Sequence, residues 1–167
     1  MGKIDPKKIT AVEKALRLLG ASACSERELA LKLRRSGFPA EEIAEAVATC
    51  RRHGFLNDEL LAEDYATLLA DRGSGRRLIK MQLKKRGLAA EHVEAAVEKT
   101  VENELENARR ALDLKLRLLS RETDPRKKKE KAFRFLAGRG FPVETIRTLF
   151  AETDFGPGED GDEEWDS

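Results

Sequence analysis

A pattern of 15 residues occurs three times along the chain, and it constrains the fold more than any other feature of the sequence. The copies begin at Leu33, Leu83 and Leu136, which lie 50 and then 53 residues apart, and they align without gaps. Each copy reads Leu-x3-Gly-apolar-x2-Glu-x-(Ile/Val)-x3-apolar. Such self-similarity is typical of repeat proteins, in which each copy is one supersecondary unit.

Each copy of the pattern describes a tight corner between two helices. Gly37, Gly87 and Gly140 stand where the first helix ends, and glycine adopts the left-handed conformation of a helix C-cap at the lowest cost. Pro39 and Pro142 fit the first turn of the next helix, where no amide hydrogen is needed. The glutamate of each copy falls in that same turn, where the helix dipole favours an anion.

Further signals mark the start of the helix before each corner and add one helix ahead of it. Ser25 and Glu28 form a capping box that begins the helix before the first corner. Asp124 and Pro125 are an N-cap and a first-turn proline for the equivalent helix of the third copy, and residues 73–75 break the chain before the middle one. Each copy also opens with an apolar helical stripe: Val12, Ala15, Leu16 and Leu19; Leu61, Tyr65, Leu68 and Leu69; Leu105, Ala108, Leu112, Leu116 and Leu119.

These signals predict an all-α protein built from three tandem three-helix repeats, each a helix-turn-helix-like unit. The repeats are expected over residues 9–58, 59–102 and 103–152. A single unit of about 45 residues buries too little apolar surface to be stable, so neighbouring repeats must stack into an elongated, curved molecule. Residues 153–167 are rich in acids and glycine, and we expect a disordered tail there.

Composition bounds the setting in which the chain works. Hydrophobic residues make up 40%, charged residues 38% and aromatic residues only 5%, a mixture typical of helical repeats. No apolar run approaches the length of a membrane span, and the N-terminus lacks the apolar core of a signal peptide. Cys24 and Cys50 form neither a CxxC motif nor a disulfide framework. We therefore expect a cytoplasmic protein, a monomer without membrane association.

The net charge of +1 conceals a basic body and an acidic tail. Residues 152–167 hold eight acidic and no basic residues, so residues 1–151 hold 32 basic and 23 acidic ones. A basic body indicates an anionic partner, and the acidic tail is a possible competitor of that partner for the same basic surface. The single tryptophan, Trp165, is either a docking handle on this tail or an incidental exposed aromatic.

Basic residues cluster on the second helix of the second and third repeats, and these clusters are the predicted nucleic-acid or partner-binding site. Lysine and arginine at this density suit phosphate contacts, which bring affinity without sequence specificity. The alternative is a solvated helix face, although two clusters at equivalent repeat positions favour binding. The residues are Arg72, Arg76, Arg77, Lys80, Lys84, Lys85 and Arg86 in the second repeat and Arg126, Lys127, Lys128, Lys129, Lys131 and Arg134 in the third.

Two other classes of function fit the sequence less well. A base-reading helix-turn-helix should present base-contacting side chains at the start of its recognition helix, but Glu41, Glu42 and Glu91 stand there. An enzyme has no constellation to support it, since no metal-ligand spacing, nucleophile elbow or phosphate-binding loop occurs. We therefore expect no catalytic residue, no metal and no cofactor.

Three segments carry a family resemblance. Residues 54–58 (GFLND) with Tyr65, residues 75–79 (GRRLI) and residues 83–88 (LKKRGL) together resemble RecX, a family of bacterial modulators of the RecA recombinase. The Ser25-x-x-Glu-Leu stretch and the Gly-Phe-Pro corners are similar too. The resemblance covers residues 11–150 and stops before the acidic tail.

The resemblance implies three tandem three-helix repeats, in agreement with the pattern itself. It further implies a negative regulator in DNA repair, homologous recombination and the SOS response, which docks on the RecA–single-stranded-DNA filament and inhibits ATP hydrolysis, filament growth and strand exchange. Contact with single-stranded DNA would then be weak or mediated by the filament. The alternative is a stand-alone nucleic-acid-binding protein of low sequence specificity.

Overall fold

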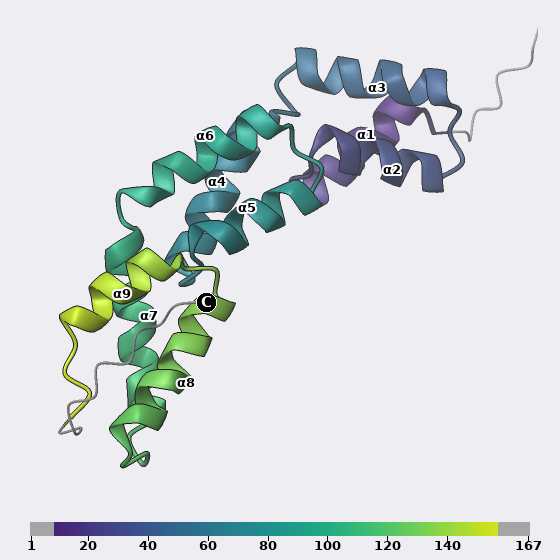
Figure 1. The fold of residues 1–167 in the computed structure, drawn as a ribbon. Coiled ribbons are helices and arrows are strands. Elements are labelled where there is room, and N and C mark those ends of the chain that lie inside the picture. Colours follow the sequence, from purple (N-terminus) through teal and green to yellow (C-terminus); the bar gives the residue numbers. More distant parts are fainter. Residues whose placement is uncertain (1–8, 157–167) are drawn as a thin grey trace, which may run out of the picture. The chain divides into compact units, whose positions relative to one another are not determined.

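The computed structural model describes residues 9–156, and this part of the chain is all-α (Figure 1). No strand occurs within it. As predicted, its helices form three consecutive three-helix repeats. They are α1 (Ala11–Ala21), α2 (Glu26–Arg35) and α3 (Ala40–Arg52), then α4 (Asp58–Asp71), α5 (Arg76–Lys85) and α6 (Ala90–Val101), then α7 (Glu104–Leu118), α8 (Pro125–Gly138) and α9 (Val143–Ala151).

The predicted corners and caps are present. Gly37, Gly87 and Gly140 have φ of 88°, 77° and 86°, in the left-handed region that glycine favours. The Ser25 capping box and the Asp124 cap of α8 also form as expected. The corner prolines differ by one position from the prediction. Pro39 and Pro142 are the extended N-cap residues of α3 and α9 and not their first helical residues.

The helices gather into two compact units. The first contains residues 9–67 and 80–99, and the second contains residues 68–79 and 100–156. In the first unit α1 packs on α2 and α3, around a core of Ala11, Ala15, Cys24, Leu29, Leu33, Ile43, Ala46, Cys50 and Leu56. In the second, α7 packs on α8 and α9, around a core of Ala108, Ala111, Leu112, Ala132, Leu136, Phe141, Ile146 and Leu149.

On the opening helices α1 and α4, the buried residues include more alanine and less leucine than the predicted stripes. Ala15 is buried as expected, but Leu16 is 40% exposed. On α4 the buried residues are Ala62, Ala66 and Ala70, whereas Leu68 is 42% exposed. Alanine lets neighbouring helix backbones approach closely, so the tightest contact does not follow the largest apolar side chains.

In the first unit, the corner that follows α5 is held against the N-terminus of α2. The Ser25 hydroxyl donates to the carbonyl of Arg86 at 2.6 Å. The Arg86 guanidinium donates to the Glu28 carboxylate at 2.8 Å and 3.0 Å and to the Ala23 carbonyl at 2.9 Å. It also lies 4.8 Å from the centre of the Tyr65 ring. Arg86 therefore connects elements of the first two repeats.

In the second unit, the corner that follows α8 is likewise hydrogen-bonded to residues around the start of α5. The Gly75 amide donates to the carbonyl of Arg139 at 2.8 Å, and the Arg77 amide donates to the carbonyl of Gly140 at 3.1 Å. The Arg139 guanidinium donates to the Arg72 carbonyl at 3.0 Å and lies 4.9 Å from the centre of the Phe135 ring. The second and third repeats are thus joined through backbone groups as well as through an arginine.

The acidic segment lies mostly outside the described residues. Of residues 153–167, only 153–156 are described, and there the Phe155 ring lies 4.8 Å from the Phe150 ring in an edge-to-face arrangement. The predicted disorder of the tail and both interpretations of Trp165 concern residues 157–167, outside the described part.

The corner glycines provide a matched pair of substitutions. A Cβ on Gly140 would lie 2.4 Å from the Leu78 amide nitrogen, whereas a Cβ on Gly37 would meet nothing within 4 Å. Gly37→Ala should cost about 1–2 kcal/mol, the strain of a left-handed alanine. Gly140→Ala should cost about 1–3 kcal/mol more, because backbone atoms cannot move aside as a side chain can. Urea unfolding followed by circular dichroism measures both, and equal losses would contradict the tight second junction.

The Glu28–Arg86 pair predicts a pH-dependent stability. Burial raises the pKa of Glu28, but hydrogen bonds from Arg86 and from the Ser25 amide, with the charges of Arg86 and Lys32, outweigh it and lower that pKa. The stabilisation is therefore complete above the ordinary pKa of glutamate and is lost as the pH falls through the lowered pKa of Glu28. Glu28→Gln should cost about 1–2 kcal/mol at neutral pH, the lower part of the range for charged hydrogen bonds because both side chains are partly exposed.

The difference in unfolding free energy between Glu28→Gln and the unmodified chain should shrink in acid, where Glu28 itself becomes protonated. Urea midpoints measured from neutral to acidic pH test the expectation. Glu45→Gln is the control, because Glu45 is exposed on α3 and has no ion-pair partner within residues 9–156. A pH-independent gap for Glu28→Gln would exclude the ionised carboxylate as the source of the stabilisation.

Candidate partner-binding surface

Three of the basic residues predicted in the second repeat are held by carboxylates. Arg86 pairs with Glu28, as described above. Arg76 donates from its amide to Glu104 at 2.9 Å and from Nε at 3.3 Å, and the Glu104 side chain is only 8% exposed. Lys80 pairs with Glu94 on the neighbouring helix α6. Arg76 and Arg86 therefore contribute to the fold itself.

The remaining cations of α5 face solvent. Arg77, Lys84 and Lys85 are exposed, and no carboxylate lies within ion-pair distance of them in the part of the chain that the structure describes. Lys84 and Lys85 belong to the first unit and lie in the last turn of α5, and Met81, 55% exposed, lies one turn before them. We call Lys84 and Lys85 the α5 basic face.

The cations of α8 divide in the same way. Lys127, Lys131 and Arg134 pair with Asp124, Glu122 and Glu130. For Arg126, Lys128 and Lys129, no carboxylate among residues 9–156 lies within ion-pair distance, and these three follow the N-cap in the first turns of α8. We call them the α8 basic turn.

The cations of the α8 basic turn oppose the dipole of their own helix, whereas Lys84 and Lys85 lie in the last turn of α5, where the dipole favours cations. The N-terminal end of a helix carries partial positive charge, so a cation there is unfavourable by about 0.3–1 kcal/mol. Neither α5 nor α8 has an acidic residue in its first turn, whereas the equivalent helix α2 has Glu26 and Glu28. The fold supplies one carboxylate near each of these helix starts, Glu104 at α5 and the Asp124 cap at α8, and a bound anion would offset the remaining charge of the α8 basic turn.

The second unit also contains a hollow that the sequence interpretation missed. It has a volume of about 730 Å³ and lies along α7, bordered by the end of α4 and by α8. Its apolar side includes Leu114 and Leu118, which are 61% and 78% exposed. Its cations are Arg72, Arg110, Lys115, Arg117 and Arg139, and among the described residues Asp71 is the only acid that lines it. We call it the α7 groove.

One predicted residue, Arg72, borders the α7 groove, and the other cations there were not predicted. The phenyl ring of Phe135 has Lys115 at 5.2 Å and Arg139 at 4.9 Å from its centre, so two of these cations stand over an aromatic face. The sequence held a signal for the groove. Leu114 and Leu118 are four residues apart and lie off the apolar stripe predicted for this helix.

The geometry suits docking. Cations without an internal partner can bind phosphates or carboxylates, and the exposed leucines of the α7 groove can bury apolar area against a protein. Among residues 9–156, no three His, Cys, Asp or Glu side chains are grouped to hold a metal ion. None of the described helices is long and apolar enough to cross a membrane.

Comparison with known proteins agrees with this architecture repeat by repeat. Models of the first, second and third three-helix domains of RecX match residues 11–50, 57–97 and 102–150. Regulatory protein RecX of Chlorobaculum tepidum is 37% identical over 86% of this chain and 88% of its own length. Regulatory protein RecX of Legionella pneumophila is 30% identical over 85% of this chain and 93% of its own.

Solved structures support the fold independently. The crystal structure of RecX from Lactobacillus salivarius matches with a TM-score of 0.76 at 24% identity, covering 85% of this chain and 93% of that one. A second crystal structure, of a regulatory protein RecX, matches with a TM-score of 0.75 at 18% identity, covering 84% of this chain and 70% of that one. With all three domains matched in order, the chain belongs to the RecX family of regulatory proteins.

Proposed function

We propose that this protein is a negative regulator of the RecA recombinase, which docks on the RecA–single-stranded-DNA filament in the cytoplasm. Docking would inhibit ATP hydrolysis, filament growth and strand exchange, and so modulate DNA repair and recombination. The proposal treats the protein as a binding module without catalytic residues. Its support is membership of a family of regulatory proteins, together with the charges of the described surface.

The observation that carries the proposal is the presence of cations that no carboxylate pairs with in the described part of the chain. The α5 basic face and the α8 basic turn have no acids of their own to neutralise them within residues 9–156. A polyanion supplies the missing charge, and binding releases its condensed counterions, which makes the affinity salt-dependent. The negatively charged partner of the proposal is the DNA phosphate backbone or an acidic face of RecA.

The α7 groove favours a partner that also contains protein. Nucleic acid alone offers phosphates and bases, whereas Leu114 and Leu118 present aliphatic surface beside the cations. Interfaces between proteins combine an apolar centre with a polar rim in this way. A nucleoprotein filament offers both kinds of surface.

Neutralising the α5 basic face should weaken inhibition of the RecA ATPase. In the double variant Lys84→Ala/Lys85→Ala, we expect the concentration for half-inhibition to rise roughly tenfold, equivalent to about 1.4 kcal/mol. The slope of inhibition against salt concentration should fall by about one for each lost phosphate contact. Arg76 and Arg86 are left unchanged because their ion pairs support the fold.

The matched control is Arg34→Ala/Arg35→Ala, because these exposed arginines occupy the equivalent positions of the first repeat, on a helix that has its own acids. Circular dichroism checks that both variants keep their helices. Equal losses in the two variants would mean that net charge alone matters. Full inhibition by the Lys84/Lys85 variant would remove the α5 basic face from the binding site.

The same basic surfaces also fit a stand-alone nucleic-acid-binding protein of low sequence specificity, and a gel-shift series without recombinase separates the two functions. The proposed regulator should shift single-stranded DNA weakly at all salt concentrations. Tight binding that falls steeply with salt would favour the stand-alone function instead. Strand-exchange assays with the same protein samples show whether RecA is affected under those conditions.

A further inference from the structure

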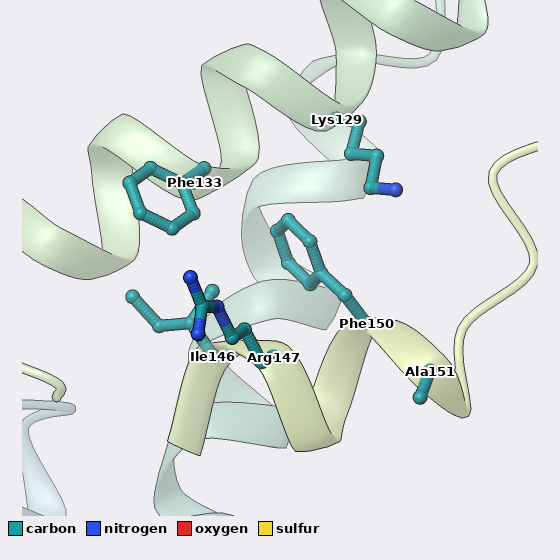
Figure 2. A pocket seen from close by; sticks show the side chains of 6 residues that line it. All are labelled: Lys129, Phe133, Ile146, Arg147, Phe150 and Ala151. Atoms are coloured by element: carbon teal, nitrogen blue, oxygen red, sulfur yellow. The ribbon is translucent and has the colours of Figure 1, made fainter. Parts of the chain in front are cut away.

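A hollow between α8 and α9 is the feature of the second unit that the proposed function leaves unexplained. It is lined by Lys129, Phe133, Ile146, Arg147, Phe150 and Ala151, and its volume is about 260 Å³. Figure 2 shows the Phe133 and Phe150 rings on either side of the gap between the two helices, with the amine of Lys129 and the guanidinium of Arg147 beside them. The hollow combines an apolar lining with a cationic rim.

The size of the hollow suits one large side chain. Sites for small molecules usually measure about 300–1,000 Å³, above the value found here. Its walls are aromatic, with Phe133 and Phe150 at 6.4 Å between ring centres and 71° between planes. A further aromatic ring can join such a pair edge-to-face, and cations at the rim can lie over its face.

The chain's own C-terminal segment begins beside this hollow. Phe155 packs against Phe150, so the last described residues already lie at the wall of the hollow. Nine residues lead from Gly156 to Trp165, enough for an extended reach of about 30 Å. A short tether of this kind holds a segment at an effective concentration on the order of millimolar.

The charges of that segment complement the rim. Residues 157–167 contain six acids and no base, and three of the acids (Glu163, Glu164 and Asp166) stand within two residues of Trp165. With the indole in the hollow, these carboxylates would come close to Lys129 and to the neighbouring cations of α8. The aromatic side chain of Trp165 therefore suits the apolar lining of the hollow, and the carboxylates next to it suit the cationic rim.

We propose that the hollow between α8 and α9 is a docking site for the acidic C-terminal segment of the same chain, with Trp165 as the residue that enters it. The docked segment covers Lys129 and brings acids against the α8 basic turn. It then competes with any polyanion for those cations and acts as a built-in restraint on binding. This last consequence rests on the proposed function, whereas the docking itself does not.

Trp165 is the only tryptophan, so its fluorescence in the full-length protein reports on the docking directly. We expect blue-shifted emission and a Stern–Volmer constant for acrylamide several-fold lower in the native protein than in urea. Lys129→Glu and Ala151→Glu, both at exposed positions, should raise this constant toward the value in urea. The control Lys127→Glu makes the same charge change as Lys129→Glu on the other side of α8 and should leave quenching unchanged.

Three results would overturn the proposal. The first is a native Trp165 as accessible to acrylamide as in urea. The second is protection that survives Lys129→Glu but is lost in Arg117→Glu, which would place the segment in the α7 groove. The third is protection that disappears on dilution, which would mean that the segment occupies another copy of the chain. None of these measurements involves RecA, so they are independent of the proposed function.

Discussion

The fold depends on one contact that occurs at both junctions between repeats. In each, the corner after the second helix of one repeat is hydrogen-bonded to residues near the start of the second helix of the preceding repeat. In both junctions the acceptor is the backbone carbonyl of the arginine that precedes the corner glycine, Arg86 or Arg139. The donor is the Ser25 hydroxyl in the first junction and the Gly75 amide in the second. Short repeats cannot bury enough apolar surface alone, so these hydrogen bonds, with the cores around them, make the repeats one folded chain.

The same two arginines explain why charge density alone is a poor guide to a binding site. Arg86 and Arg139 each donate to a backbone carbonyl before the second helix of the preceding repeat and lie over an aromatic ring. The first repeat has Ser36 at this position. An arginine that pairs with a buried or half-buried carboxylate is already committed, and only the structure separates it from the cations that remain available to a partner.

Much of the architecture could be predicted because its signals are local. Capping residues, corner glycines and the spacing of the pattern depend on a few neighbouring residues, and the structure confirms them. The buried face of α4 could not be predicted in this way, because Ala66 is buried and Leu68 is 42% exposed, the reverse of what side-chain hydrophobicity predicts. The α7 groove was missed because its cations come from α7 and from the residues that follow α4 and α8, which only the fold brings together, although Leu114 and Leu118 were a local signal.

The junctions also explain how the repeats could diverge in charge while keeping one fold. Their acceptors are backbone carbonyls, so substitutions on the solvent side of α5 or α8 leave those bonds intact. The first repeat keeps Glu26 and Glu28 where the dipole of α2 favours them, and Glu28 also serves the junction. The third repeat instead carries Arg126, Lys128 and Lys129 in the first turns of α8, where the dipole disfavours cations and the Asp124 cap offsets part of the cost. A surface that is unfavourable in the isolated chain is best explained by what binds it, whether a polyanionic partner or the chain's own acidic segment.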